Sequence, residues 1–156
     1  MTNNLLITSA FNTQFGECLH EIGILYPEES KLKKYIRYVE SVKKMNPSLL
    51  IKSWKKYITD KYESHIETND LEYFLTKDYQ ADLTPSEKTK TVEEIIEYLR
   101  TMMTGMSPEN KTKSFEYIQN LTKLSKHYVE SLKGIYFKII WHLKDFAPFC
   151  MTLSRI

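Results

Sequence analysis

The chain has 156 residues, 42% hydrophobic and 27% charged, which is close to the averages of globular proteins. Four glycines and five prolines exclude a low-complexity chain, and a chain of this length buries about 70% of its unfolded surface. The net charge of +2 hides a separation, since Lys31 to Lys61 has ten basic and two acidic residues, and Tyr62 to Glu87 has seven carboxylates and one lysine.

Apolar residues recur at helical spacing along the chain, and strand patterns are almost absent. We therefore predict an all-α fold, a single-domain bundle over residues 1–156 with about six or seven helices, mostly antiparallel because the connections are short. The expected helices run from Thr8 or Ser9 to before Pro27, from Glu28 to Met45, from Pro47 to Ile66, across Leu71 to Leu75, from Pro85 to Met103, from Pro108 to Lys133 and from Tyr136 to Phe146.

Capping signals set several of these limits. Thr84 to Glu87 combines a capping box with proline at the first helical position, and Ser107 before Pro108 is expected to cap the next helix. Gly105 and Gly134 are each expected to stop a helix. Leu132 is predicted to be the last inward residue before the second stop.

Residues 77–83 are polar and acidic, so we expect a loop there. The neighbouring carboxylates do not predict a metal site, because a calcium loop needs a central glycine and none occurs between Gly23 and Gly105. The sequence leaves open whether this loop covers the basic helices or lies on another face. The first arrangement neutralises charge within the domain, and the second favours head-to-tail assembly.

Basic residues on two neighbouring helices form the first candidate site. One face of each helix gathers them, and such a strip is typical of phosphate binding. The other interpretation is an ordinary solvated lysine face, which the sequence pI of 8.4 favours. The candidate anion or nucleic-acid contacts are Lys34, Arg37, Lys44, Lys52, Lys55 and Lys56.

No catalytic motif is present, and we predict a protein that is not an enzyme and uses no cofactor or metal. Cys18 and Cys150 lack metal-ligand spacing and are expected to be reduced, packed thiols. On a helix Cys18 and His20 point about 200° apart, so Cys18 is expected inside and His20 outside. The chain shows no secretory leader and no apolar run of ~20 residues, so we expect an intracellular protein without a transmembrane segment.

The apolar C-terminal segment, residues 135–156, is the second candidate site. Seven of its first nine residues are apolar or aromatic, a density expected of a buried helix or of a partner-binding surface. If it is exposed, the segment favours self-association or shallow membrane association. The candidate interface residues are Tyr136, Phe137, Ile140 and Trp141.

Three stretches of sequence carry a resemblance. They are Asn46-Pro47-x-Leu49-Leu50-Ile51-x-x-Trp54-Lys55-x-Tyr57-Ile58, the stretch Tyr62-x-x-x-Ile66-Glu67-x-x-Asp70-x-x-Tyr73-Phe74-Leu75 followed by Lys77-Asp78-Tyr79, and Tyr117-Ile118-Gln119-Asn120-Leu121-Thr122-Lys123-Leu124-Ser125. Together they resemble a family of small helical proteins encoded by nucleocytoplasmic large DNA viruses of the giant-virus type. The resemblance implies a viral protein of an infected-cell cytoplasm or a virion, and it carries no functional residues.

The sequence thus favours a non-enzymatic interaction or structural protein that self-associates or docks on a protein partner. A nucleic-acid-binding module that uses the basic strip is the alternative. The two differ in the expected effect of salt, because phosphate contacts weaken steeply as salt rises.

Overall fold

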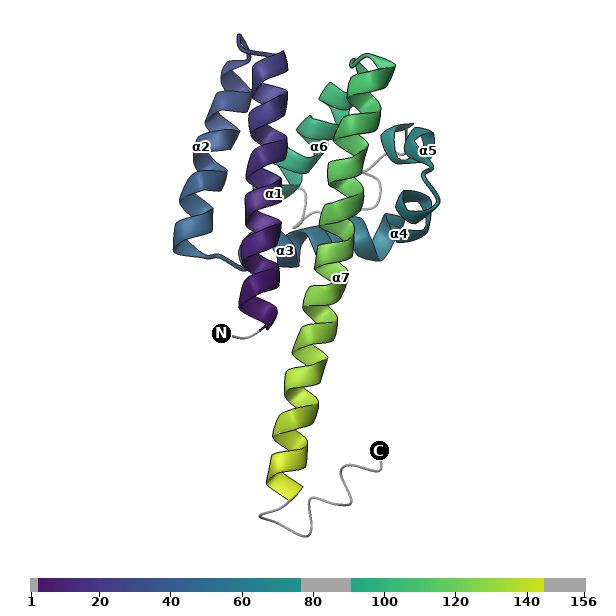
Figure 1. Ribbon diagram of the computed structural model, residues 1–156. Coiled ribbons are helices and arrows are strands. Elements are labelled where there is room, and N and C mark those ends of the chain that lie inside the picture. Colours follow the sequence, from purple (N-terminus) through teal and green to yellow (C-terminus); the bar gives the residue numbers. More distant parts are fainter. Residues whose placement is uncertain (1–2, 77–90, 145–156) are drawn as a thin grey trace.

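The computed structural model describes residues 3–76 and 91–144, and the regular structure of these residues is helical throughout (Figure 1). This confirms the predicted all-α bundle. The expected acidic loop at 77–83 and the capping box from Thr84 to Glu87 lie outside the described residues. The helices are α1 (Asn3–Leu25), α2 (Ser30–Met45), α3 (Leu49–Trp54), the π-helical segment η1 (Lys55–Thr59), α4 (Asp60–Glu67), α5 (Leu71–Thr76), α6 (Thr91–Thr104) and α7 (Pro108–Lys144).

Two antiparallel helix pairs form the body of the molecule. Helices α1 and α2 make one pair, α6 and the first half of α7 make the other, and α1 packs along α7 (Figure 1). The continuous run of α3, η1 and α4 crosses the lower end of both pairs at a steep angle. We call this run, Leu49 to Glu67, the base of the bundle, and α7 continues past it.

Trp54 of α3 joins the base to the helices above. Its ring makes edge contacts with Phe11 and Phe15 of α1, at centroid distances of 6.1 and 6.0 Å. Its indole Nε1 donates a hydrogen bond of 3.1 Å to the Thr122 hydroxyl of α7. Because Trp54 is only 1% exposed, this one side chain ties three helices together in the core.

Helices α1 and α2 approach closely at two glycines spaced one heptad apart. A Cβ at Gly16 would lie 3.1 Å from Lys43 Nζ, and a Cβ at Gly23 would lie 3.3 Å from Ile36 Cδ1. Both distances are tighter than ordinary packing, so at the two glycines the side-chain ends of Lys43 and Ile36 lie close over α1.

The π-helical segment η1 divides the helix that the sequence predicts from Pro47 to Ile66. Tyr57, Ile58 and Thr59 are buried consecutively, which an α-helix with one inward face does not allow. The wider turn rotates Thr59 inward, where its hydroxyl lies 2.6 Å from the hydroxyl of Ser125 on α7. The segment thus serves the contact between the base and α7.

The start of α1 differs from the prediction. Thr8 is expected to cap the helix, yet α1 begins at Asn3. The Thr8 hydroxyl donates to the Asn4 carbonyl at 2.9 Å, the backward bond of a residue inside a helix. The capping interpretation of Thr8 is therefore wrong.

The predicted stop at Gly134 is also wrong, because α7 continues through this residue to Lys144. Gly134 lies inside α7 and lacks the positive φ that often accompanies a glycine stop. A glycine inside a helix costs only about 0.5–1 kcal/mol, which the hydrogen bonds of the following turns offset. The other stop is confirmed, since α6 ends at Thr104 before Gly105, and the Ser107 hydroxyl accepts a bond from the Asn110 amide at 3.3 Å as α7 begins.

Candidate interaction surfaces

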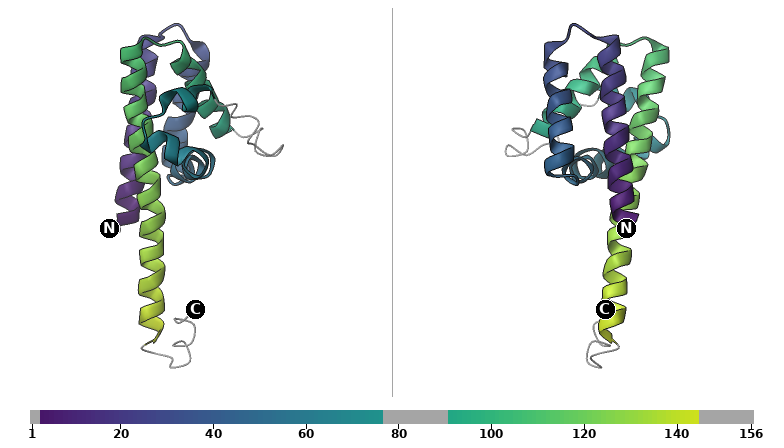
Figure 2. Two further views of the ribbon diagram at one scale, coloured as in Figure 1. Left: turned by 90° about the vertical axis from the view of Figure 1, so that its right-hand side faces the viewer. Right: turned by 60° about the vertical axis from the view of Figure 1, so that its left-hand side comes forward.

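The second half of α7 extends away from the bundle. We call Val129–Lys144 the arm. Its first turn still packs against the core through Val129, and in Figure 1 and in both views of Figure 2 no described helix lies beside the rest of the arm. At 1.5 Å per residue the arm is about 24 Å long. The candidate interface residues Tyr136, Phe137, Ile140 and Trp141 all lie within its helical backbone.

One stripe of α7 runs from the core into the arm. It advances by alternate steps of three and four residues, the repeat of helices that pack along their length. Within the bundle its members are 0–4% exposed, and past the bundle the exposed fraction rises to 42% at Leu132, which the sequence places on an inward face. The stripe consists of Phe115, Ile118, Thr122, Ser125, Val129, Leu132, Tyr136, Ile139 and Leu143.

The first turns of α1 lie where α7 leaves the bundle (Figures 1 and 2). Two of their side chains, Leu5 and Leu6, are 58% and 54% exposed. Exposed leucines at this end of α1 extend the apolar surface from the arm onto the bundle. None of the described helices is long and apolar enough to cross a membrane.

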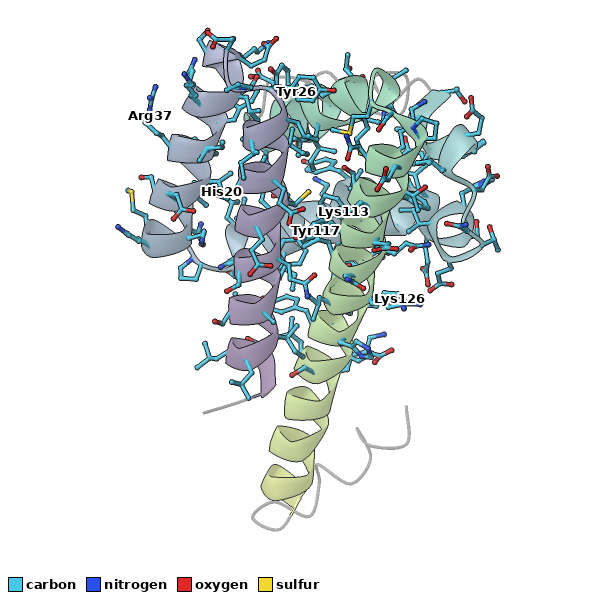
Figure 3. All side chains as sticks on the ribbon, turned by 45° about the horizontal axis from the view of Figure 1, so that its top comes forward. His20, Tyr26, Arg37, Lys113, Tyr117 and Lys126 are labelled. Carbon is cyan, nitrogen blue, oxygen red and sulfur yellow. The ribbon has the colours of Figure 1, made fainter. Side chains whose placement is uncertain are left out.

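The basic residues of α2 lie on its solvent face. Lys34, Arg37 and Lys44 are exposed, and Figure 3 shows Arg37 pointing away from α1. None of these three pairs with a carboxylate among the described residues, whereas Lys43 binds Glu40 at 3.2 Å. A cationic face on one helix is thus available to an anionic partner.

The basic residues of the base are more engaged. Lys52 is exposed, but Lys55 is half-buried and forms an ion pair with Asp60. This pair joins residues five apart, a spacing that the π-helical turn brings into line. The Lys56 ammonium lies 5.1 Å from the centroid of the Tyr57 ring. Since the base crosses α2 at a steep angle, the six predicted residues do not follow two parallel helices.

The described part of the acidic stretch is used within the fold. Lys126 of α7 lies 2.5 Å from Glu63 and 2.6 Å from Glu67 of α4, and these bonds raise the lysine pKa above its ordinary value (Figure 3). Asp70 accepts bonds from His65 and from the Tyr73 amide, and these lower its pKa while capping α5. These carboxylates are therefore already paired within the fold.

A cavity of about 220 Å³ lies between α1 and α7, and no sequence pattern predicts it. Its polar groups come from residues almost a hundred positions apart: Glu21 lies 3.6 Å from Lys113 Nζ and accepts a hydrogen bond from Tyr117 (Figure 3). Desolvation, followed by the charge of Glu21, raises the pKa of Tyr117. Only the antiparallel register of the two helices brings these groups together.

Cys18 lines the same cavity without being activated. Burial raises the pKa of its thiol to about 12, so the nucleophilic thiolate is absent at neutral pH. His20 is exposed on the other side of α1, which confirms the predicted opposition of the two residues. In the described ranges no three His, Cys, Asp or Glu residues are arranged to hold a metal ion. Cys150 lies outside these ranges.

Comparisons with known proteins add no relative: no family model, no curated protein and no solved structure matches the chain. The viral resemblance therefore stays a prediction. The function has to be argued from the surfaces themselves.

Proposed function

We propose that this protein is a non-enzymatic interaction protein, which docks on another protein molecule through the arm of α7. The single observation behind the proposal is the stripe that continues from the core into a helix with no described neighbour. In the bundle this stripe is covered by α3 and η1, among other elements.

The arm needs a cover because of its composition. Three aromatic and four aliphatic residues occupy the nine positions from Ile135 to Leu143. Most helical stability in proteins comes from the packing of an apolar face, and this part of α7 has no described helix to pack on. Contact with another molecule supplies the burial that keeps an apolar helix of this kind folded.

Hydrogen exchange on the full chain tests the proposal, with the molar mass measured by light scattering on the same samples. We expect the arm amides to exchange slowly in a complex or assembly, and close to the unprotected rate in any monomer. A monomer in which the arm amides exchange as slowly as those of α1 would contradict the proposal, because the chain's own residues would then cover the arm.

Nucleic-acid binding is the second candidate, favoured by the unpaired cationic face of α2. Replacing Lys34, Arg37 and Lys44 with Ala is expected to weaken the dependence of nucleic-acid affinity on salt. The slope of log affinity against log salt concentration should become shallower by about 0.9 for each phosphate that the variant no longer neutralises. Ala at Lys111 and Lys123 of α7 is the control. If wild-type protein retards neither DNA nor RNA at low salt, this candidate fails.

A further inference from the structure

We infer that the molecule covering the arm is a second copy of this chain, whose arm lies antiparallel to the first about a twofold axis. The inference rests on the proposed function and names its partner. Three observations support it: the apolar area of the arm, the register of its stripe, and the apolar turns of α1 beside its root.

Part of the apolar area of the arm fits a pairing of two arms. The side that carries the stripe has Leu132, Tyr136, Ile139 and Leu143, while Phe137 and Trp141 lie on the other side of the helix. A standard protein interface buries about 800 Å² on each partner. Two arms therefore supply part of this area, and the exposed Leu5 and Leu6 of α1 add to it.

The spacing of the stripe gives an antiparallel pair a twofold register. When two such stripes pair head to tail, Leu132 of one arm is level with Leu143 of the other, and Tyr136 is level with Ile139. These layers are apolar or aromatic on both sides, as they are in a parallel pair, so the direction follows from the exposed leucines of α1. Within the bundle the stripe packs on α3 and η1 of its own chain. In the dimer the part of the stripe in the arm packs on the second copy.

The antiparallel direction also uses the exposed leucines of the bundle. The tip of each arm reaches the level where the other α7 leaves its bundle, and Leu6 of α1 is 54% exposed at that end. A parallel pair leaves this side chain in water. The isologous arrangement therefore covers the apolar surface at both ends of the interface.

Disulfide cross-linking tests the pairing and its direction. Two full-length proteins carry Cys150→Ser and either Leu132→Cys or Leu143→Cys, and they are co-expressed with tags of different size. The buried Cys18 stays in place. We expect the mixed disulfide between positions 132 and 143 to exceed either self-linked product at least tenfold, since residues 11 apart along the arms are ~16 Å apart and a disulfide needs Cα atoms within ~7 Å.

Self-linked products as abundant as the mixed one would overturn the antiparallel pairing. The Cys150→Ser protein with an unchanged arm gives an independent result, because its mass should be twice that of the 18.5 kDa chain. A monomer overturns the inference. If the arm of that monomer exchanges rapidly, docking on another protein stands, and if it exchanges slowly, both proposals fail.

Discussion

The two halves of α7 carry the same stripe in different surroundings. In the bundle the stripe includes Thr122 and Ser125, whose hydroxyls bond Trp54 and Thr59 across the core. In the arm the corresponding positions are apolar. Polar groups are tolerated in a core where their partners are fixed by the same chain, whereas a surface covered by another molecule relies on shape and apolar area.

The two tryptophans give the largest contrast between the halves. Trp54→Ala is expected to lower the free energy of unfolding by about 3–5 kcal/mol, because it empties the core between α1, α3 and α7. Trp141→Ala is expected to change it by less than about 0.5 kcal/mol when both are measured in an Ile139→Glu background, where the arm is unpaired. Urea unfolding followed by circular dichroism measures both, and equal losses would show that the arm packs on its own bundle.

The buried hydroxyls sharpen the contrast at a single hydrogen bond. Thr122→Val keeps the shape of the side chain but leaves the Trp54 indole N–H without its acceptor, at a cost of about 1–3 kcal/mol. The matched control is Thr112→Val, an exposed threonine of α7 whose hydroxyl bonds only its own helix. Similar losses at the two sites in chemical denaturation would argue against the buried bond between α3 and α7.

The pH dependence of folding stability tests the contact of α1 with the half of α7 that lies in the bundle. The folded thiol of Cys18 has its pKa raised from 9.0 to about 12, so the unfolded chain loses a proton first as the pH rises. The stabilisation is complete below about pH 9 and falls between pH 9 and 12 by up to about 1.4 kcal/mol per pH unit. Unfolding of wild type and Cys18→Ala across this range should show their difference in stability shrinking, and a constant difference would refute the buried neutral thiol.

Gly134 lies near the boundary between the two halves of α7, and its substitution is expected to have the smallest effect on stability. A Cβ at Gly134 meets nothing within 4 Å, so Gly134→Ala is expected to stabilise the helix by about 0.5–1 kcal/mol. If Gly134 were the stop that the sequence suggests, the same change would be destabilising. Thermal unfolding separates the two signs.

Much of the fold follows from the sequence, because periodic apolar residues and capping signals act locally. The helix ends at Gly105 and Ser107 are as predicted, but α7 does not end at Gly134. A glycine that ends a helix and a glycine inside a helix look alike in sequence until the following turns are considered. The helical repeat of apolar residues also predicts that Arg37 is exposed, as it is in the structure.

The candidate surfaces were only partly predictable. The apolar arm was visible in the sequence, but its separation from the bundle depends on where α1 and the base end along α7. The pairing of Lys55 with Asp60 requires a π-helical turn, and the contact of Glu21 with Tyr117 requires the register of two distant helices. No local pattern encodes either of these.

Sedimentation equilibrium of three full-length proteins tests the central claim most directly. Wild type and Asn120→Glu, a charge placed on the exposed face of α7 within the bundle, should have twice the 18.5 kDa chain mass. Ile139→Glu places the same charge in the arm stripe and should sediment at 18.5 kDa with the circular dichroism of a folded bundle. One mass for all three proteins would contradict the account.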